Sequence, residues 1–219
     1  MTAMTPYLIG SPWRIGPRPD LPKSIVKTNA SGEEIHECVD HHLFQDNDSV
    51  WHLWGCIRNL RIGRILYHWT SNDLFSDDWI QTGEYFRILQ STGESIRDWE
   101  EEEWIQSPYF VNHDGLHYMF YGGHSTGTNA SGVEVSSNDF SVECQMCLMK
   151  SSDGNKWERH DNGQGLSRIF VGPGEVRDPC VIRYKDKWLM YYAGYHDAIR
   201  TNPGVYIRES TNLIDWSDW

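Results

Sequence analysis

The sequence predicts an all-β protein made of repeated antiparallel sheets, and three observations lead to that prediction. A unit of two strands joined by a polar turn occurs three times along the 219 residues. Aromatic residues, including 11 Trp and 11 Tyr, must supply much of the core of a chain that is 39% hydrophobic, and aromatics pack well on pleated strands. No segment shows a convincing apolar period of 3.6 residues, and the acidic run 98–103 is the one short helical candidate.

The three units can be aligned by counting residues. Asp40, Ser107 and Asp178 stand at the start of the first strand of each unit, 67 and 71 residues apart. The second strands begin 10 or 11 residues after these positions. Each unit ends, after a Ser-x-Asp or Ser-x-Asn turn, on a tryptophan: Trp79, Trp157 and Trp216.

Antiparallel strands that recur about every 70 residues indicate the blades of a β-propeller. We expect a propeller domain over 36–219, with four-stranded blades at about 36–80, 104–158 and 175–219. Proline and glycine punctuate residues 1–35, which we expect to form an extended segment. A propeller needs about 4–8 blades to close. We therefore expect a five-bladed ring of which this sequence contains about three blades and lacks C-terminal ones.

The charge of the chain excludes some partners. With 31 acidic and 19 basic residues the formal net charge is −12, which argues against binding to nucleic acid or to an anionic membrane surface. No apolar run approaches the ~18–20 residues of a membrane span. Residues 1–10 lack the features of a signal peptide. We expect a cytoplasmic protein, with secretion left open if the N-terminus is incomplete, and the oligomeric state is not predicted.

Cysteine and histidine do not predict a metal site. The five cysteines are scattered and odd in number, so a disulfide framework is not expected. Cys144 and Cys147 form a C-x-x-C inside a predicted strand, where positions three apart face opposite sides. His41 and His42 likewise face opposite sides of their strand. We expect no metal ligands and no cofactor.

Two of the units resemble a known group of enzymes. Arg177-Asp178-Pro179, followed by Trp188-Leu189-Met190-Tyr191-Tyr192, resembles the R-D-P … W-x-M-Y-Y blade of five-bladed propeller glycoside hydrolases. Gln106-Ser107-Pro108-Tyr109, with 115–121, is similar to their E-(A/G/S)-P … G-x-Y-Y-x-F-Y blade. These are families 43, 32, 62 and 68, which include arabinanases, xylosidases, invertases and levansucrases. The resemblance covers about residues 36–219 and is specific for the superfamily rather than for one family.

The resemblance implies a glycosidase that cleaves a furanosidic or related oligo- or polysaccharide with paired carboxyl groups. It implies that Asp40 is the catalytic base or nucleophile and that Asp178 is the transition-state stabiliser or pKa modulator. Both residues are also compatible with simple turn capping. A structural calcium at the propeller axis is implied by the resemblance alone.

The general acid departs from the family pattern, because Gln106 stands where these enzymes have Glu. Several alternatives stay open: Glu103 or Glu175 substitutes for it, the acid lies in a further blade, or the protein does not catalyse. In the last case the chain is a non-catalytic carbohydrate-binding propeller, or a scaffold for protein partners. The candidate catalytic set is Asp40, Asp178 and Glu103, and the candidate substrate-binding residues are His42, Trp104, Gln106, Tyr109 and Arg177.

Overall fold

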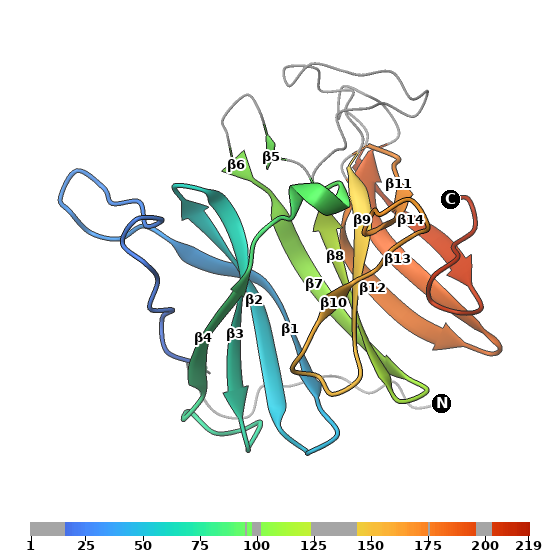
Figure 1. Cartoon of the computed structure of the whole chain (residues 1–219), viewed down its shortest axis with the longest axis horizontal. Coiled ribbons are helices and arrows are strands. Elements are labelled where there is room, and N and C mark those ends of the chain that lie inside the picture. Colours follow the sequence, from blue (N-terminus) through green and yellow to red (C-terminus); the bar gives the residue numbers. More distant parts are fainter. Residues whose placement is uncertain (1–15, 95, 98–101, 124–143, 175, 196–202) are drawn as a thin grey trace, which may run out of the picture.

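The computed structural model describes residues 16–94, 96–97, 102–123, 144–174, 176–195 and 203–219, which form three antiparallel sheets standing side by side (Figure 1). The first sheet contains β1 (Glu37–Gln45), β2 (Trp51–Leu60), β3 (Gly63–Ser71) and β4 (Ile80–Phe86) in consecutive pairing. The short strands β5 (Ile96–Arg97) and β6 (Glu102–Glu103) extend it, with β6 parallel to β3. A single 3-10 turn, η1 (Gln90–Thr92), precedes them in the described part of the chain.

The second and third sheets repeat the same up-and-down order. The second contains β7 (Ile105–His113), β8 (Leu116–Gly123) and β9 (Gln145–Ser151), with β10 (Glu158–Arg159) and β11 (Arg168–Val171) both paired to β9. The third contains β12 (Arg177–Tyr184), β13 (Lys187–Tyr195) and β14 (Pro203–Ser210). These meanders confirm the predicted fold class. Within the described ranges, no helix is long and apolar enough to cross a membrane.

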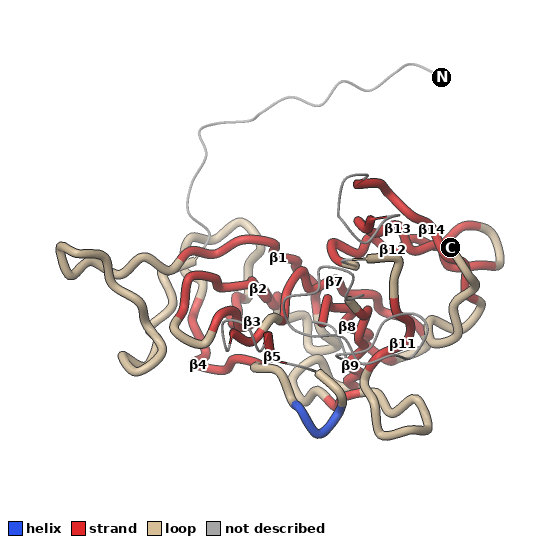
Figure 2. The backbone as a smooth tube through the Cα atoms, turned by 90° about the horizontal axis from the view of Figure 1, so that it is seen from above, coloured by secondary structure: helices blue, strands red, loops and turns tan. Residues whose placement is uncertain are grey.

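The first strands of the three sheets lie next to one another. Both β1 and β12 pack against β7, and the view from above shows the later strands of each sheet lying farther out (Figure 2). This is the arrangement of propeller blades, in which each innermost strand faces the axis. Residues about 70 positions apart in the sequence therefore become neighbours at the axis.

Two apolar clusters join the sheets. The cluster between the first and second sheets includes Phe44, Trp54, Phe110 and Met119. A second cluster between the second and third sheets includes the following buried side chains: Val111, Phe120, Leu148, Val181, Met190 and Tyr192. Since both faces of the second sheet are covered in this way, most residues of its three long strands are buried. This explains why aromatic and aliphatic residues run almost continuously through β8.

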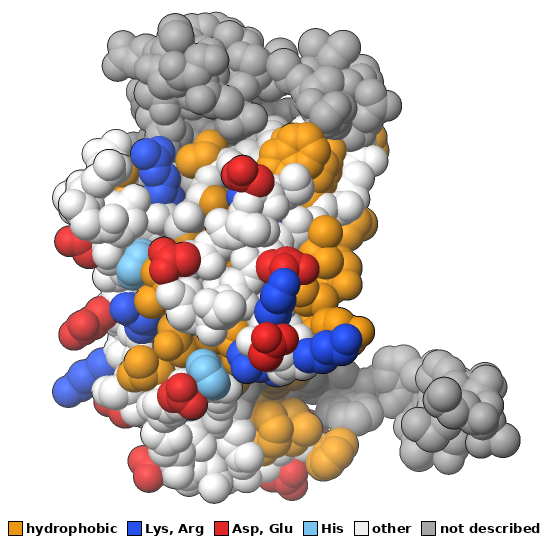
Figure 3. All heavy atoms as spheres, turned by 90° about the vertical axis from the view of Figure 1, so that its right-hand side faces the viewer, with side chains coloured by type: hydrophobic (Ala, Val, Ile, Leu, Met, Phe, Trp, Pro, Cys, Tyr) orange, Lys and Arg blue, Asp and Glu red, His pale blue; other side chains and the backbone are white. Residues whose placement is uncertain are grey.

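The outward face of the first sheet is covered by the N-terminal segment. Leu21, Ile25 and Val26 are buried against the sheet, in a cluster that also contains Trp69 and Trp79. The corresponding face of the third sheet differs, because several of its apolar side chains are exposed (Figure 3). These side chains are Ile182, Tyr184, Val205 and Ile207.

The turn that ends each unit has a physical reason. After the third strand of each sheet, a serine hydroxyl accepts the backbone N–H of the residue two positions later, at Asp73, Asp153 and Asn212. In the second and third sheets the tryptophan indole then donates to a carbonyl three residues before it. The Ser-x-Asp … Trp pattern is thus a hydrogen-bonded turn closed by a packed ring.

The outer strand of the first sheet lies beyond the limit that we expect from the sequence. The strand β4 follows Trp79 and ends at Phe86, whereas the first blade was expected over 36–80. The short β10 likewise follows Trp157. The sequence Ile80–Phe86 lacks the apolar alternation of a strand because all seven of its residues are exposed or only half-buried on the outer edge. In the acidic run 98–103, Glu102 and Glu103 form β6 and the rest lies outside the described residues.

A row of hydrogen-bonded polar side chains crosses the interior of the first sheet. Asp46 Oδ2 lies 3.1 Å from Nε2 of His52, whose Nδ1 lies 2.9 Å from Nε2 of His68. Nδ1 of His68 lies 3.2 Å from the hydroxyl of Thr82. One proton assignment satisfies this buried row: each group donates toward Asp46, which is ionised and also accepts two backbone N–H groups of its own turn.

Candidate active site

The first strand of each sheet carries the same irregularity. The pairing register shifts between Val39 and His41 in β1, and it shifts at the equivalent places in β7 and β12. The residues at these bulges, Asp40, Ser107 and Asp178, have φ angles of 36°, 54° and 56°. Non-glycine residues with positive φ are uncommon, and bulges often re-aim a side chain next to a functional site. The backbone therefore presents these three side chains in an equivalent way.

The three side chains meet at the axis. The hydroxyl oxygen of Ser107 lies 2.6 Å from Oδ1 of Asp178 and 3.3 Å from Oδ2 of Asp40. The two carboxylate oxygens are therefore separated by no more than these two distances together. Ser107 is buried, whereas both aspartates are exposed to solvent. We call these three residues the axial cluster.

The hydrogen bonds of the axial cluster make the two carboxylates unequal. A serine hydroxyl has one proton to donate, and the 2.6 Å partner is the better acceptor. Arg177 Nε also lies 3.3 Å from the second oxygen of Asp178. Asp178 is thus held on both oxygens, while Asp40 keeps more of its lone pairs available. The Arg177 guanidinium itself lies 5.6 Å above the ring of Tyr195.

His42 and Tyr109 form part of the interfaces between sheets. Nδ1 of His42 accepts the backbone N–H of Phe110 at 2.9 Å, and its ring stacks on Tyr109 at 4.2 Å. Burial, aided by the charge of His41, lowers the pKa of His42 to about 4, so the ring is neutral at pH 7. Burial and the neighbouring Cys180 thiol raise the pKa of the Tyr109 hydroxyl to about 12. These contacts join the strands that carry Asp40, Ser107 and Asp178.

Gln106 is buried beside the axial cluster and is held by an arginine. Its amide oxygen accepts a hydrogen bond from Nη1 of Arg64, which reaches across from β3. The Arg64 guanidinium also lies 4.6 Å above the ring of Trp104. Gln106 therefore has a fixed place at the position where the resembling enzymes have their acid.

Glu103 lies apart from the axial cluster among the described contacts. Both of its oxygens accept from Nε of Arg87 at 3.0 Å, and Nη2 of the same arginine also donates to it. Its side chain is 6% exposed. The described contacts thus tie Glu103 to Arg87 and not to Asp40 or Asp178. Glu175 lies outside the described residues.

Two features of the site were not predicted from the sequence. Ser107 was used to set the register, but its role as a bridge between the two carboxylates was missed. Its alignment with Asp40 and Asp178 was the available signal, because equivalent positions in a propeller converge. Arg64 was also missed, since a single arginine in a strand carries no sequence signal.

The described residues do not fit a calcium ion at the axis. Among them, no group of three or more His, Cys, Asp or Glu side chains is arranged to hold a metal ion. The axial cluster offers two carboxylates and one hydroxyl, and calcium usually takes 6–8 oxygen ligands.

Comparison with known proteins agrees with this architecture. No protein-family model matches the chain. A curated relative, a probable sucrose-6-phosphate hydrolase of Psychromonas ingrahamii, is 26% identical over 181 residues. The match covers 81% of this chain and 27% of the relative, so the chain spans about a quarter of that protein.

Solved structures share the fold at low sequence identity. A levansucrase of B. megaterium has a TM-score of 0.57 at 8% identity, covering 82% of this chain and 51% of that chain. An alpha-L-arabinofuranosidase of Lactobacillus brevis has a TM-score of 0.56 at 14% identity, with coverages of 84% and 52%. A beta-fructofuranosidase of Bombyx mori, solved in complex with sucrose, has a TM-score of 0.54 at 18% identity, with coverages of 82% and 34%. The three sheets are therefore blades of the β-propeller fold found in glycoside hydrolases such as beta-fructofuranosidases, levansucrases and arabinofuranosidases.

Proposed function

We propose that the protein is a glycoside hydrolase that cleaves O-glycosidic bonds of a furanosidic or related oligo- or polysaccharide. The observation that carries the proposal is the convergence of Asp40 and Asp178 on the hydroxyl of Ser107. Each of these residues stands at a bulge with positive φ, on strands that would otherwise pair regularly. Similarity to glycoside hydrolases in sequence and in fold supports the same function.

The geometry suggests different roles for the two carboxylates. Asp40 is exposed and weakly engaged by Ser107, so its oxygens can attack an anomeric carbon or activate a water. Asp178 is held by Ser107 and Arg177, which suits a fixed group that accepts sugar hydroxyls and stabilises the positive charge of the transition state. His42, Trp104, Gln106, Tyr109 and Arg177 are proposed to line the sugar site.

The general acid is a separate part of the proposal. Gln106 carries no acidic proton, and both oxygens of Glu103 accept from Arg87. In the proposed mechanism the acid therefore comes from a residue outside the described ranges. In the family 32 enzymes that the chain resembles, the acid follows the Arg-Asp-Pro blade.

A second candidate function is a carbohydrate-binding propeller without catalysis. The observation that favours it is the buried Gln106, whose amide oxygen is already bound to Arg64. An amide at this position keeps hydrogen-bonding capacity and loses the ability to protonate a leaving group. This candidate predicts sugar binding with no turnover, and it predicts that Gln106→Glu introduces turnover.

The test is an assay of hydrolysis with sucrose and with 4-nitrophenyl alpha-L-arabinofuranoside. Wild-type protein is expected to release product, and Asp40→Asn is expected to lower kcat about 10²–10⁴-fold. Asp178→Asn is expected to lower kcat about 10²–10³-fold, as the loss of one stabilising group does. Asp186→Asn, on the hairpin turn of the third sheet, is the matched control and should retain activity.

The outcomes separate the two candidates. Turnover that is unchanged in Asp40→Asn rejects the proposed hydrolytic site. Sugar binding by the wild type without any hydrolysis, combined with turnover in Gln106→Glu, replaces the hydrolase with the binding propeller. Binding can be followed by calorimetry with sucrose or arabinose.

A further inference from the structure

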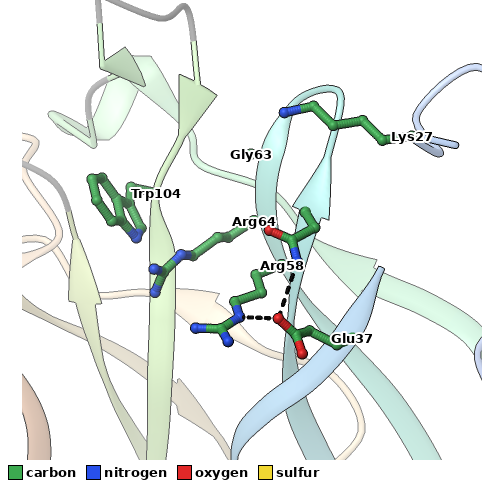
Figure 4. A pocket seen from close by; sticks show the side chains of 7 residues that line it. Lys27, Glu37, Arg58, Gly63, Arg64 and Trp104 are labelled. Atoms are coloured by element: carbon green, nitrogen blue, oxygen red, sulfur yellow. Dashed lines mark hydrogen bonds and ion pairs between the residues drawn. The ribbon is translucent and has the colours of Figure 1, made fainter. Parts of the chain in front are cut away.

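A pocket of about 230 Å³ opens at the end of the first sheet where β1 and β3 begin (Figure 4). Its walls come from the N-terminal segment, from the first sheet and from the residue before β7. The lining residues are Lys27, Glu37, Arg58, Asn59, Gly63, Arg64 and Trp104. No role in the proposed hydrolysis is assigned to this pocket, apart from Trp104.

The lining of the pocket is basic in a chain that is acidic overall. Lys27, Arg58 and Arg64 are cationic, and Glu37 is the one acidic side chain among the lining residues. The formal net charge of the whole chain is −12. A concave site lined by one sign of charge concentrates the opposite charge within it. The pocket therefore attracts anions on a protein that otherwise repels them.

Arg58 and Arg64 differ in how their charge is used. Arg58 Nε lies 2.6 Å from Glu37 Oε1, which also accepts from the side-chain amide of Asn59 at 3.0 Å. Among the described residues, Arg64 makes no ion pair and donates one hydrogen bond, to the neutral amide of Gln106. A guanidinium has five N–H donors. Within the described part of the chain, Arg64 thus keeps a charge that no carboxylate pairs with, and donors that no acceptor uses, in the pocket.

The position of the Arg64 guanidinium is fixed by its neighbours. Gln106 holds Nη1 from one side, and the ring of Trp104 lies 4.6 Å from the guanidinium carbon. Such a cation–π contact and hydrogen bond together orient the planar fork. A planar guanidinium fork matches the two oxygens of a carboxylate or a phosphate in bidentate geometry.

The pocket is connected to the axial cluster through one peptide bond. Gln106 binds Arg64, and the next residue, Ser107, binds Asp40 and Asp178. A molecule at the axial cluster is therefore within reach of a charged group at Arg64.

We propose that this pocket binds the anionic substituent, a carboxylate or a phosphate, of the glycan that occupies the axial cluster. Arg64 is the principal ligand of the substituent, and Lys27 and Arg58 supply the surrounding positive charge. The statement that the rest of the glycan lies at the axial cluster rests on the proposed function. The anion site itself depends only on the residues of the pocket.

The test is an NMR titration that follows the side-chain Nε–Hε signal of Arg64. The probes are inorganic phosphate, D-fructose 6-phosphate and D-galacturonate, with D-fructose and D-galactose as neutral counterparts. We expect the Arg64 signal to move with the anionic probes and the neutral sugars to bind at least tenfold more weakly. The tighter of the two anionic sugars identifies the substituent as a phosphate or a carboxylate.

A matched pair of variants assigns the effect to the pocket. Arg64→Met should weaken binding of the anionic probes at least tenfold. Arg183→Met removes an arginine that also lies over a tryptophan, 5.0 Å from the ring of Trp188, but does not line the pocket. This control should bind the anions as the wild type does.

Three results would overturn the anion site: no movement of the Arg64 signal with any anion, equal affinity for neutral sugars, or an equal loss of affinity in Arg183→Met. The titration involves no hydrolysis, so its result is independent of turnover. Anion binding without any turnover would reject the proposed hydrolase while retaining this pocket. Turnover of neutral glycosides without anion binding would reject the pocket alone.

Discussion

The first sheet contributes to two hydrogen-bonded networks centred on carboxylates, which differ in burial, in backbone conformation and in hydrogen bonding. In the axial cluster, Asp40 is exposed, stands at a bulge with positive φ, and shares one hydroxyl with a second carboxylate. In the buried row, Asp46 is enclosed, and its oxygens accept from His52 and from two backbone N–H groups. Among the described residues, the axial carboxylates have lone pairs that no protein group uses fully. The buried row is fully satisfied by the protein itself.

This difference indicates which network serves stability and which serves chemistry. A buried carboxylate that loses its partners leaves uncompensated charges and donors, so such networks are strongly coupled to folding. Positive φ at a non-glycine residue costs of order 1 kcal/mol, and such strain collects at functional sites. We therefore expect substitutions in the buried row to change the free energy of unfolding. Substitutions in the axial cluster should change activity.

The largest effect is expected for Asp46→Ala in the buried row. The substitution removes the acceptor of His52 and of two backbone N–H groups, and it should lower the free energy of unfolding by about 3 kcal/mol. Urea denaturation measures this change. Asp186→Ala, on the exposed turn of the third sheet, should change it by less than about 0.5 kcal/mol. Equal effects of the two substitutions would remove the contrast between the networks.

The next effect is expected for Ser107→Ala in the axial cluster. Loss of the hydroxyl removes the hydrogen bond that orients Asp178, and kcat/KM should fall about 10–100-fold, the equivalent of a charge-assisted hydrogen bond. The urea midpoint should change little, because both carboxylates remain exposed to water. Ser107→Thr, which keeps a hydroxyl, should recover part of the activity. A large loss of stability with unchanged kcat/KM would place Ser107 with the structural network.

A smaller effect is expected from acidification. Burial, together with the charge of His52, lowers the pKa of His68 to about 3, whereas an unfolded histidine titrates near 6.5. Between these values the unfolded chain binds more protons, so stability is full above pH 6.5 and falls as the pH falls toward 3. The groups that face His68 are His52, Thr82 and the exposed Glu84, whose carboxylate lies 3.4 Å away.

The pH effect can be measured by urea denaturation at pH 7.5 and 5.5. We expect His68 alone to contribute a loss of about 1 kcal/mol, and the low pKa of His42, about 4, to add a further loss in the same direction. His68→Gln is expected to be less stable at pH 7.5 and to show a smaller dependence on pH. An identical pH dependence in this variant would contradict the assignment.

The smallest effect is expected for Glu103→Gln. Because Glu103 is bound to Arg87, the substitution should leave kcat/KM within about threefold of the wild type and lower stability modestly. The same hydrolysis assay measures it. A fall of more than about 100-fold would instead identify Glu103 as the general acid.

The fold could be predicted from the sequence because its signal is repeated. Alternation within single strands is weak here, but three copies of one unit fix the register of each other. The repeat alone therefore predicts that Asp40, Ser107 and Asp178 occupy equivalent positions. The strand β4 was missed because it has few buried residues and so little apolar pattern.

The partners of individual side chains could not be predicted in the same way. Arg64 of the first sheet reaches Gln106 of the second sheet, and Arg87 reaches Glu103 from the segment after β4. Such pairs depend on which face of the sheet each side chain points to, and a bulge of one residue moves the following side chains to the opposite face. The position of Glu103 in the sequence, next to the predicted start of a blade, therefore does not predict that its partner is Arg87.

The repeated bulge has a consequence for how this fold can change. The backbone pairing, and not the side chain, creates each of the three positions at the axis, and the chain already fills them with two different residue types. Exchange of one residue at the axis leaves the strand pairing intact. Each of the three bulges thus presents whichever side chain the sequence provides. The residues at the axis can therefore change by single substitutions while the sheets are retained.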